Sequence, residues 1–404
     1  MIRPMRLAFT ALVVAATPAV AQEAPEPVRI GELNSYSDLA AFTVPYRQGW
    51  RLAVEEINAA GGVLGGRPLE VISRDDGATT GDAVRVAEEL VSREDVAFLF
   101  GTFLSNVGIA VADFAAQREM LFLAAEPLTD ALGLEAGNRF TFRMRPSTEM
   151  QTAMLVDAAE RAGIAAERWA LVAPNYEYGQ AAASAFARLA DARMADAEIV
   201  AEQFPALGRI DAGATIAAIE RARPDAIFNA LFGGDLAKFV REGAIRGTFA
   251  GRDVLSLITG EPEWLYPLGR EVPEGWLVTG YPWAQIDDPA HVAFVEAYQA
   301  RWDGAAPRLG SLLGYMVGQT IAAMLEEAGS TDTEAMIAAL ETIEVATPQG
   351  PLRFRAIDNQ STMGAWVGRL ELGDDGRGRM TDWRYLDGAD YLLAEERVRA
   401  VRSD

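Results

Sequence analysis

Few residues in this chain could carry covalent or acid–base chemistry. The 404 residues include no cysteine and a single histidine, His291. With no cysteine and only one histidine, most nucleophile–base pairs and most zinc sites are excluded. Asp75 and Asp76 are neighbouring carboxylates that could serve acid–base or metal chemistry, but they lie between a strand pattern and a loop. We therefore expect loop and capping roles for this pair, and we expect no metal and no cofactor.

The segment around His291 reads "DDPAHVAFVEAY", which is typical of the start of an exposed helix. A histidine in such a place is far more often a surface residue than a catalytic one. We therefore expect His291 on the surface, and we predict that the protein is not an enzyme.

A glycine-rich stretch, "NAAGGVLGGRPLEVISRDD" at residues 58–76, is a second place to look for chemistry. A phosphate cradle runs from strand to glycines to helix, because the amino end of the helix supplies free N–H groups. Here the order is helix, glycines, strand, and no lysine-serine or lysine-threonine pair follows. Gly61 and Gly62 can end the helix, and the next two glycines can turn the chain into the strand. The stretch is therefore a connection and not a nucleotide site.

The elements that would position a site alternate between strand and helix. Strand patterns in "VRIGELNS" and "PLEVISRDD" are each followed by helical spacing, in "GWRLAVEEINAA" and "TGDAVRVAEELVSR". The runs "VAFLFG" and "MLFLAA" are nearly all apolar, as expected of strands buried on both faces. The alternation resumes with "RWALVAP", "AIFNALF" and "VLSLIT". This order predicts an α/β fold with parallel sheets flanked by helices.

The amino end has the pattern of an export signal. Arg3 and Arg6 precede an apolar run that ends in the cleavage pattern "AVA". The run is too short to span a bilayer comfortably and contains Pro18. We predict a cleavable signal peptide over residues 1–21, a cut before Gln22 and a periplasmic location.

Removal of the leader would leave 404 − 21 = 383 residues, enough for two domains. The formal net charge is −22, which makes the chain a poor candidate for binding nucleic acid or anionic lipid. We expect a monomer with no nucleic-acid partner.

The segment "GWRLAVEEINAAGGVLGGRPLEVISRDD" resembles the opening signature of periplasmic solute-binding proteins of branched-chain amino acid ABC transporters. The resemblance continues in "FLFGTFLSNVGIAVADFA", "AAEPLT" and "PNYEYGQ", and it covers most of the chain after the leader. It implies the type I periplasmic binding protein fold, in which two Rossmann-like lobes are joined by three crossover strands and close on a small ligand. The first lobe would hold residues 28–146 and 281–346, and the second residues 147–280 and 347–404.

The strand pattern supports a ligand site independently. In open parallel sheets, ligands bind beyond the carboxyl ends of the strands, where loops lead into helices. Five loops stand at such places: Thr102–Ser105, Ala124–Thr129, Pro174–Gly179, Phe232–Asp235 and Gly260–Glu263.

Ser105 is the sharpest candidate. It follows a buried strand and precedes a helix, so its hydroxyl and the next N–H groups, beginning with Asn106, could face a carboxylate. From the residues alone, a helix-capping serine is the simpler interpretation. The resemblance favours binding, because the corresponding serine in the family holds the carboxylate of the ligand.

The segment "FLAAEPLT" departs from the family pattern, which has a threonine near this point. Ala124 and Ala125 can offer backbone groups only. Glu126 either enters the cleft or is a solvated loop charge, and the sequence leaves both alternatives open. The departure weakens any transfer of leucine-type specificity.

The resemblance implies further contacts from Phe42, Tyr178, Phe232, Gly233 and Glu261. In amino-acid-binding members, an acid near Glu261 meets the ammonium group of the ligand. From the residues alone, Phe42 could equally lie in the core, and Glu261 could equally be a solvated charge.

The expected function is that of an exported receptor of an ABC importer, which captures a small amino acid or related organic acid and delivers it to the permease subunits. Alternatives are a sensory binding protein of the same fold and an exported enzyme. Aromatic residues in the candidate loops favour an amino acid of branched-chain or aromatic type. A plain aromatic acid becomes the alternative if Glu261 does not face the ligand.

Overall fold

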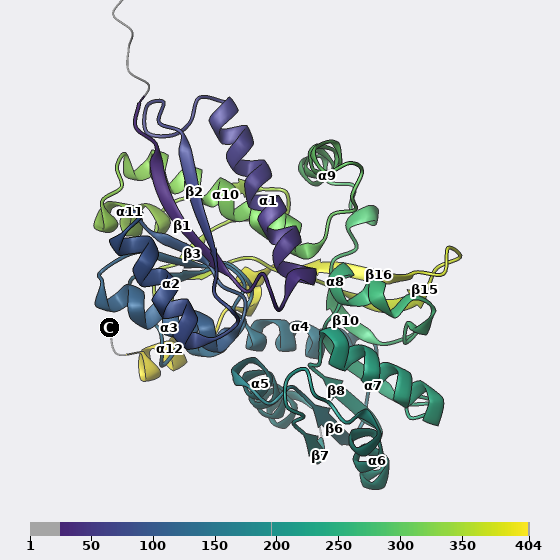
Figure 1. Cartoon of the computed structure of the whole chain (residues 1–404). Coiled ribbons are helices and arrows are strands. Elements are labelled where there is room, and N and C mark those ends of the chain that lie inside the picture. Colours follow the sequence, from purple (N-terminus) through teal and green to yellow (C-terminus); the bar gives the residue numbers. More distant parts are fainter. Residues whose placement is uncertain (1–24, 195, 403–404) are drawn as a thin grey trace, which may run out of the picture.

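The structure is a computed structural model that describes residues 25–194 and 196–402. The predicted leader, residues 1–21, lies outside the described residues. Figure 1 shows two lobes, each built on its own sheet and flanked by helices. No helix within the described ranges is long and apolar enough to cross a membrane.

The first sheet is mainly parallel and has the strand order β13-β14-β5-β4-β3-β1-β2. Its central strands pair in parallel without a register shift, so their carboxyl ends come to one edge. The strands are β1 Val28–Asn34, β2 Leu69–Asp75, β3 Leu99–Gly101, β4 Phe122–Ala124, β5 Thr141–Arg143, β13 Phe354–Arg355 and β14 Gln360–Ser361.

The helices of the first lobe include a closely packed pair, α1 and α10. A side-chain carbon added to Gly49 of α1 would lie 2.0 Å from the carbonyl oxygen of Ser311, and one added to Gly314 of α10 would lie 2.1 Å from that of Tyr46. Glycine at these positions therefore lets the two backbones touch. The helices of this lobe are α1 Ala40–Ala59, α2 Thr80–Ser92, α3 Ser105–Gln117, α9 Pro289–Arg301, α10 Leu309–Ala328, α11 Thr333–Leu340 and α12 Glu395–Val401.

The second sheet has the order β16-β15-β10-β9-β8-β6-β7, with parallel central strands and an antiparallel hairpin at one edge. The hairpin projects beyond the lobe in Figure 1. The strands of the second sheet are β6 Arg168–Val172, β7 Glu198–Gln203, β8 Ala226–Asn229, β9 Asp253–Gly260, β10 Leu277–Gly280, β15 Ala365–Leu372 and β16 Gly378–Leu386, and the last two form the hairpin. The flanking helices are α4 Thr148–Arg161, α5 Glu177–Arg193, α6 Ala212–Ala222, α7 Gly233–Arg246 and the short α8 Pro262–Leu265.

The predicted α/β fold with two flanked parallel sheets is confirmed, but one boundary differs from the expected division. The expected division places residues 347–404 in the second lobe, whereas β14 pairs in parallel with β5 of the first sheet at Gln360 and Arg143. The chain leaves the first lobe only after Ser361. Strands of two residues carry no alternation that a sequence pattern could reveal. The last helix, α12, also packs on the first lobe, where Val398, Leu393 and Leu134 form one apolar cluster.

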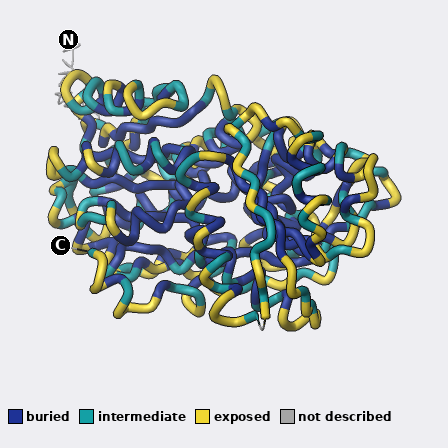
Figure 2. Tube along the Cα trace, turned by 90° about the horizontal axis from the view of Figure 1, so that it is seen from below, coloured by how far each residue is buried: buried dark blue, intermediate teal, exposed yellow. Residues whose placement is uncertain are grey.

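Both lobes have dense apolar interiors. Figure 2 shows buried segments running through the centre of each lobe, with exposed segments at the outside. The strands "VAFLFG" and "FLA" supply fully buried side chains such as Phe98, Phe100 and Phe122, as their apolar runs predict.

His291 contradicts the expectation of a surface position. Helix α9 begins at Pro289, near the predicted start, but the His291 side chain is buried. Its Nε2 atom lies 2.7 Å from the hydroxyl of Tyr281, and burial lowers the pKa of the imidazole to about 4. The covering residue comes from the chain segment that passes between the lobes, so a local helical pattern could not reveal the contact.

Candidate functional site

A narrow cavity lies between the two lobes and is walled by both. The first lobe and the loop that leaves it contribute Phe103, Ser105, Glu126, Leu128 and Arg145, and the second lobe contributes Tyr176, Tyr178, Phe232, Ile258, Glu261 and Trp264. The free space is about 20 Å³, roughly the room that one water molecule needs. This space is too small for a molecule of amino-acid size.

The five loops chosen from the sequence meet at this cavity. Four of them provide Ser105, Glu126, Tyr178 and Phe232, and Glu261 comes from the fifth. They converge because each follows the carboxyl end of a strand, and because the two sheets face each other with these ends inward. The strand pattern thus located the segments, while the lobe arrangement brought them together.

Ser105 is the first residue of α3 and is buried with 2% of its surface exposed. The N-cap position belongs to Leu104, which offers no side-chain hydrogen bond to the helix. Ser105 is therefore not a capping serine, and the first N–H groups of α3 have no side-chain cap in the part of the chain that the structure describes. Its Oγ accepts a hydrogen bond from the backbone N–H of Thr129 at 3.2 Å, which leaves the hydroxyl hydrogen available. Free N–H groups with the positive end of a helix dipole suit an anionic group.

The backbone before Ser105 turns sharply. Gly101 has φ of 117° and Thr102 has φ of 62°, so both are in the left-handed region. A side-chain carbon on Gly101 would lie 2.3 Å from the carbonyl oxygen of Leu33, which makes glycine necessary there. The turn directs the following helix at the cavity.

Glu126 is not a solvated loop charge, because only 2% of its surface is exposed and it lines the cavity. Its Oε1 accepts a hydrogen bond from Asn34 Nδ2 at 3.0 Å, while its Oε2 has no hydrogen-bond partner within the described ranges. Burial raises the pKa of this carboxyl well above its usual range, against the opposing effects of the Asn34 hydrogen bond and the positive charge of Arg145.

Arg145 and Glu261 form a buried ion pair across the two lobes. Arg145 lies in residues 144–147, between β5 and α4, where the chain first passes from one lobe to the other; we call this the first crossing segment. The Arg145 side chain is 4% exposed and that of Glu261 is 2% exposed. Arg145 Nη2 donates to Glu261 Oε1, and Trp264 Nε1 donates to Glu261 Oε2 at 3.1 Å. Burial raises the pKa of Glu261, while Arg145 lowers it. Glu261 therefore points neither to solvent nor with a free oxygen into the cavity, since both of its oxygens have donors.

Aromatic rings from both lobes surround the cavity. The Phe232 ring centroid lies 5.4 Å from that of Trp264, 6.0 Å from that of Tyr178 and 6.2 Å from that of Phe103. The buried hydroxyl of Tyr178 has no hydrogen-bond partner in the described part of the chain. The rings can enclose a bulky apolar group, and the free hydroxyl can reach a polar one.

Five sequence-derived candidates lie near the cavity but do not line it. Phe42 is fully buried behind it, with its ring 5.0 Å from Phe103 and under the Arg145 guanidinium at 5.6 Å. Ala124 and Ala125 are held in the sheet by backbone hydrogen bonds. The remaining two, Asn106 and Gly233, are adjacent to lining residues and begin α3 and α7.

Three lining residues were missed by sequence reasoning: Arg145, Ile258 and Trp264. Arg145 had a usable signal, because "FRMRP" places a charge directly after an apolar strand. Ile258 has φ of 54°, a strained value for a β-branched residue that sequence does not reveal. Trp264 lies one turn after Glu261 and follows the same strand end.

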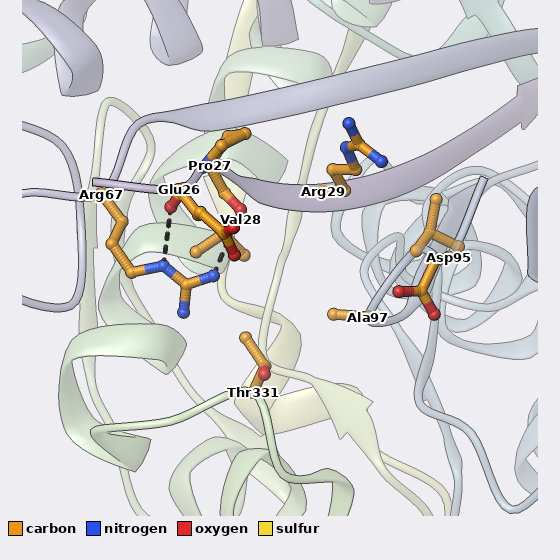
Figure 3. A pocket seen from close by; sticks show the side chains of 9 residues that line it. Glu26, Pro27, Val28, Arg29, Arg67, Asp95, Ala97 and Thr331 are labelled. Atoms are coloured by element: carbon orange, nitrogen blue, oxygen red, sulfur yellow. Dashed lines mark hydrogen bonds between the residues drawn. The ribbon is translucent and has the colours of Figure 1, made fainter. Parts of the chain in front are cut away.

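A second hollow lies far from this cavity, at the start of the described chain. Figure 3 shows Arg67 there, donating to the carbonyl oxygens of Glu26 at 2.9 Å and Pro27 at 3.2 Å. These contacts fix the edge of β1, and no buried polar atom points into the hollow without a partner among the described residues. Nor do the described ranges contain a cluster of three or more acidic or histidine residues that could hold a metal ion.

Comparison with known proteins agrees with this geometry. The profile of the periplasmic binding protein family matches residues 27–377. A Leu/Ile/Val-binding protein homolog 7 of Brucella suis is 25% identical over 355 residues, covering 83% of this chain and 86% of that protein.

Two solved structures show the same architecture. An ABC transporter substrate-binding protein from Sphaerobacter thermophilus is 27% identical, with a TM-score of 0.78 over 89% of this chain and 98% of that one. A solute-binding protein of an ABC transporter from Rhodopseudomonas palustris, in complex with 3,4-dihydroxybenzoic acid, is 21% identical, with a TM-score of 0.79 over 90% and 98%.

The similar proteins are described as binding proteins and not as enzymes. The resemblance found in the sequence is thereby confirmed. The chain belongs to the periplasmic binding protein family, among the ABC-transporter substrate-binding proteins of the branched-chain amino acid type.

Proposed function

We propose that this protein is an exported receptor that captures a small amino acid or related organic acid between its lobes and delivers it to the permease of an ABC importer. The observation that carries the proposal is the convergence of Ser105 and the uncapped amino end of α3 on a cavity walled by both lobes. Family membership supports a small ligand and permease partners.

The carboxylate of the solute is best placed at the amino end of α3. The hydroxyl of Ser105 can donate one hydrogen bond, and the first N–H groups of the helix can donate others. The remainder of the solute would extend toward Tyr178 and Phe232 of the second lobe. The Brucella relative, named for leucine, isoleucine and valine, supports an apolar side chain there.

Capture requires a hinge motion. The cavity has room for about one water molecule, so the described structure corresponds to a closed state that a solute cannot enter directly. The lobes are joined by short crossing segments, which can bend while the sheets remain rigid. Contacts made only in the closed state would then favour closure on the solute. Export to the periplasm by the leader at residues 1–21 fits this role.

The test is a thermal-shift screen of purified mature protein against amino acids, their deaminated acids and aromatic acids. A solute that binds only the folded state, present at a free concentration of a hundred times its Kd, raises the free energy of unfolding by about 2.7 kcal/mol. We expect a clear rise in Tm with at least one small carboxylate. Sugars and amines without a carboxylate serve as comparison classes. The absence of a Tm rise with every carboxylate in the screen would contradict the proposed ligand class.

A further inference from the structure

The cavity contains a buried carboxylate oxygen that no group of the described residues satisfies. Glu126 Oε2 is buried and lacks a hydrogen-bond partner within the described ranges, although the other oxygen of the same carboxyl is held by Asn34. A buried polar atom without a partner costs free energy, so such atoms in native proteins commonly have a function. Because Glu126 lines the cavity, a ligand group is well placed to supply the missing donor.

The other acid of the cavity cannot play this part without losing what it already holds. Glu261 accepts from Arg145 on one oxygen and from Trp264 on the other. Turning it toward a solute would leave Arg145 as an unpaired buried charge, which is costly. Glu261 therefore holds the first crossing segment against the second lobe through its ion pair with Arg145.

We propose that Glu126 binds a protonated amine of the solute, while Glu261 makes no direct contact with the solute and instead holds Arg145 and Trp264. The proposal rests on the proposed receptor function and narrows it from small carboxylates in general to solutes that carry an ammonium group. It assigns amine selection to a loop after β4, in the first lobe, and not to the loop after β9.

The surroundings of Glu126 favour a cationic partner. The charged and titratable groups that face it are Glu32 of β1, Tyr46 of α1, Arg145 of the first crossing and Glu263 of α8. Two of these neighbours, Glu32 and Glu263, are acids whose pKa values burial raises to about 8 and about 7, and Arg145, the one cation among them, is already paired with Glu261. An ammonium group brings positive charge and three donors into this acidic surrounding, whereas a plain carboxylate brings neither.

A protonated Glu126 offers a competing arrangement, in which its O–H donates to a plain acid. The two arrangements differ in how they respond to Glu126→Gln. The amide of glutamine can still donate to a carboxylate, but it cannot form an ion pair with an ammonium group.

The experiment is calorimetry with three matched probes: L-leucine, its deaminated acid 4-methylpentanoate and its decarboxylated amine 3-methylbutylamine. A second series uses L-phenylalanine, 3-phenylpropanoate and 2-phenylethylamine. In Glu126→Gln, we expect the amino acid and the amine to lose about tenfold to a hundredfold in affinity. The deaminated acid should bind the variant as well as it binds the wild-type protein, or better.

Two further variants separate amine selection from general damage to the site. Glu261→Gln should change the affinities for all three probes of a series by similar factors, because its effect passes through the position of Arg145. Asp358→Asn removes another buried carboxyl, which pairs with Arg355 and does not line the cavity, and it should preserve the ranking of the probes.

Proton exchange with the buffer gives an independent readout. Since burial raises the pKa of Glu126, an arriving ammonium group should displace a proton from it, up to about one per bound solute near neutral pH. The binding enthalpy of the amino acid should therefore vary with the ionisation enthalpy of the buffer in the wild-type protein and should lose this variation in Glu126→Gln.

Several results would overturn the inference while leaving the receptor function intact. One is equal loss of the amino acid and its deaminated acid in Glu126→Gln, and another is wild-type preference for the deaminated acids. A loss of amino-acid binding in Glu261→Gln that spares the deaminated acid would return amine selection to Glu261. Failure of every ammonium-bearing probe to bind the wild-type protein would likewise overturn it.

Discussion

The two walls of the interlobe cavity differ in chemistry. The wall from the first lobe and the loop that leaves it presents Ser105, Glu126 and Arg145, beside the amino end of a helix. The wall from the second lobe presents mainly the rings of Tyr176, Tyr178, Phe232 and Trp264. The first wall can satisfy charge, and the second can remove water and cover apolar surface.

This difference suggests an order of events. A charged solute would first meet the polar wall, where oriented N–H groups and the Glu126 carboxyl can replace its hydration. Closure would then bring the rings over the solute. Exclusion of water strengthens the charged contacts already made, because the local dielectric falls. Binding of the charged groups at the polar wall would therefore be strengthened when the lobes close.

The Arg145–Glu261 pair is the exception, because it joins the two walls. Its members come from the first crossing segment and from the second lobe, and both are buried. The same two residues also line a hollow on the hinge side, together with Thr279 and Trp366. The pair thus separates the cavity from the hinge and couples the position of one wall to that of the other.

The largest expected effect comes from breaking this pair. Arg145→Met should lower the free energy of unfolding by about 3–5 kcal/mol, because Glu261 would be left as an uncompensated buried charge. Urea denaturation of the ligand-free protein measures the change.

The matched control for that measurement is Arg139→Met. Arg139 pairs with Glu334 on the surface, where both side chains are more than half exposed, so its replacement should have a much smaller effect. The double variant Arg145→Met with Glu261→Gln should recover part of the lost stability. If Arg145→Met and Arg139→Met have equal free energies of unfolding, the buried pair does not stabilise the contact between the two walls.

A smaller effect is expected at the polar wall. Ser105→Ala removes one hydroxyl donor to the carboxylate of the solute and should weaken binding by about 1.5–3 kcal/mol in calorimetry. The variant also frees the N–H of Thr129, so its Tm should be recorded alongside. If the Tm falls but the affinity stays unchanged, Ser105 positions the loop and does not bind the solute.

The smallest of these effects concerns the aromatic wall. Tyr178→Phe keeps the ring and removes a buried hydroxyl that has no partner among the described residues, so binding should weaken by about 0.5–1.5 kcal/mol. Tyr315→Phe is the matched control, because that hydroxyl bonds to Glu56 far from the cavity. Unchanged affinity in Tyr178→Phe would mean that the second wall contributes through its rings alone.

Much of the fold could be read from local patterns. The apolar runs at residues 96–101 and 120–125 predicted buried strands, and helical spacing around Trp50 predicted α1. The short strands β13 and β14 could not be predicted, because two residues show no period and β14 joins the sheet by pairing with β5, more than 200 residues earlier in the chain.

The candidate site was predictable at the level of loops but not of atoms. A strand end followed by a helix start is a local signal, and it selected the loops that meet at the cavity. The orientation of an acid at such a loop is set by distant groups. Asn34 orients Glu126 across 92 residues of chain, and Arg145 captures Glu261 across 116.

The sequence by itself determined the alternation of strands and helices, the family and the loops that supply the cavity, because these follow from periodicity and chain order. Only the tertiary structure decided which charges are paired. It paired Glu261 with Arg145, left one oxygen of Glu126 without a donor among the described residues, and buried His291 next to Tyr281. The physical reason is that burial and pairing depend on which side chains the two lobes bring within a few ångströms, and such contacts carry no periodic signal along the chain.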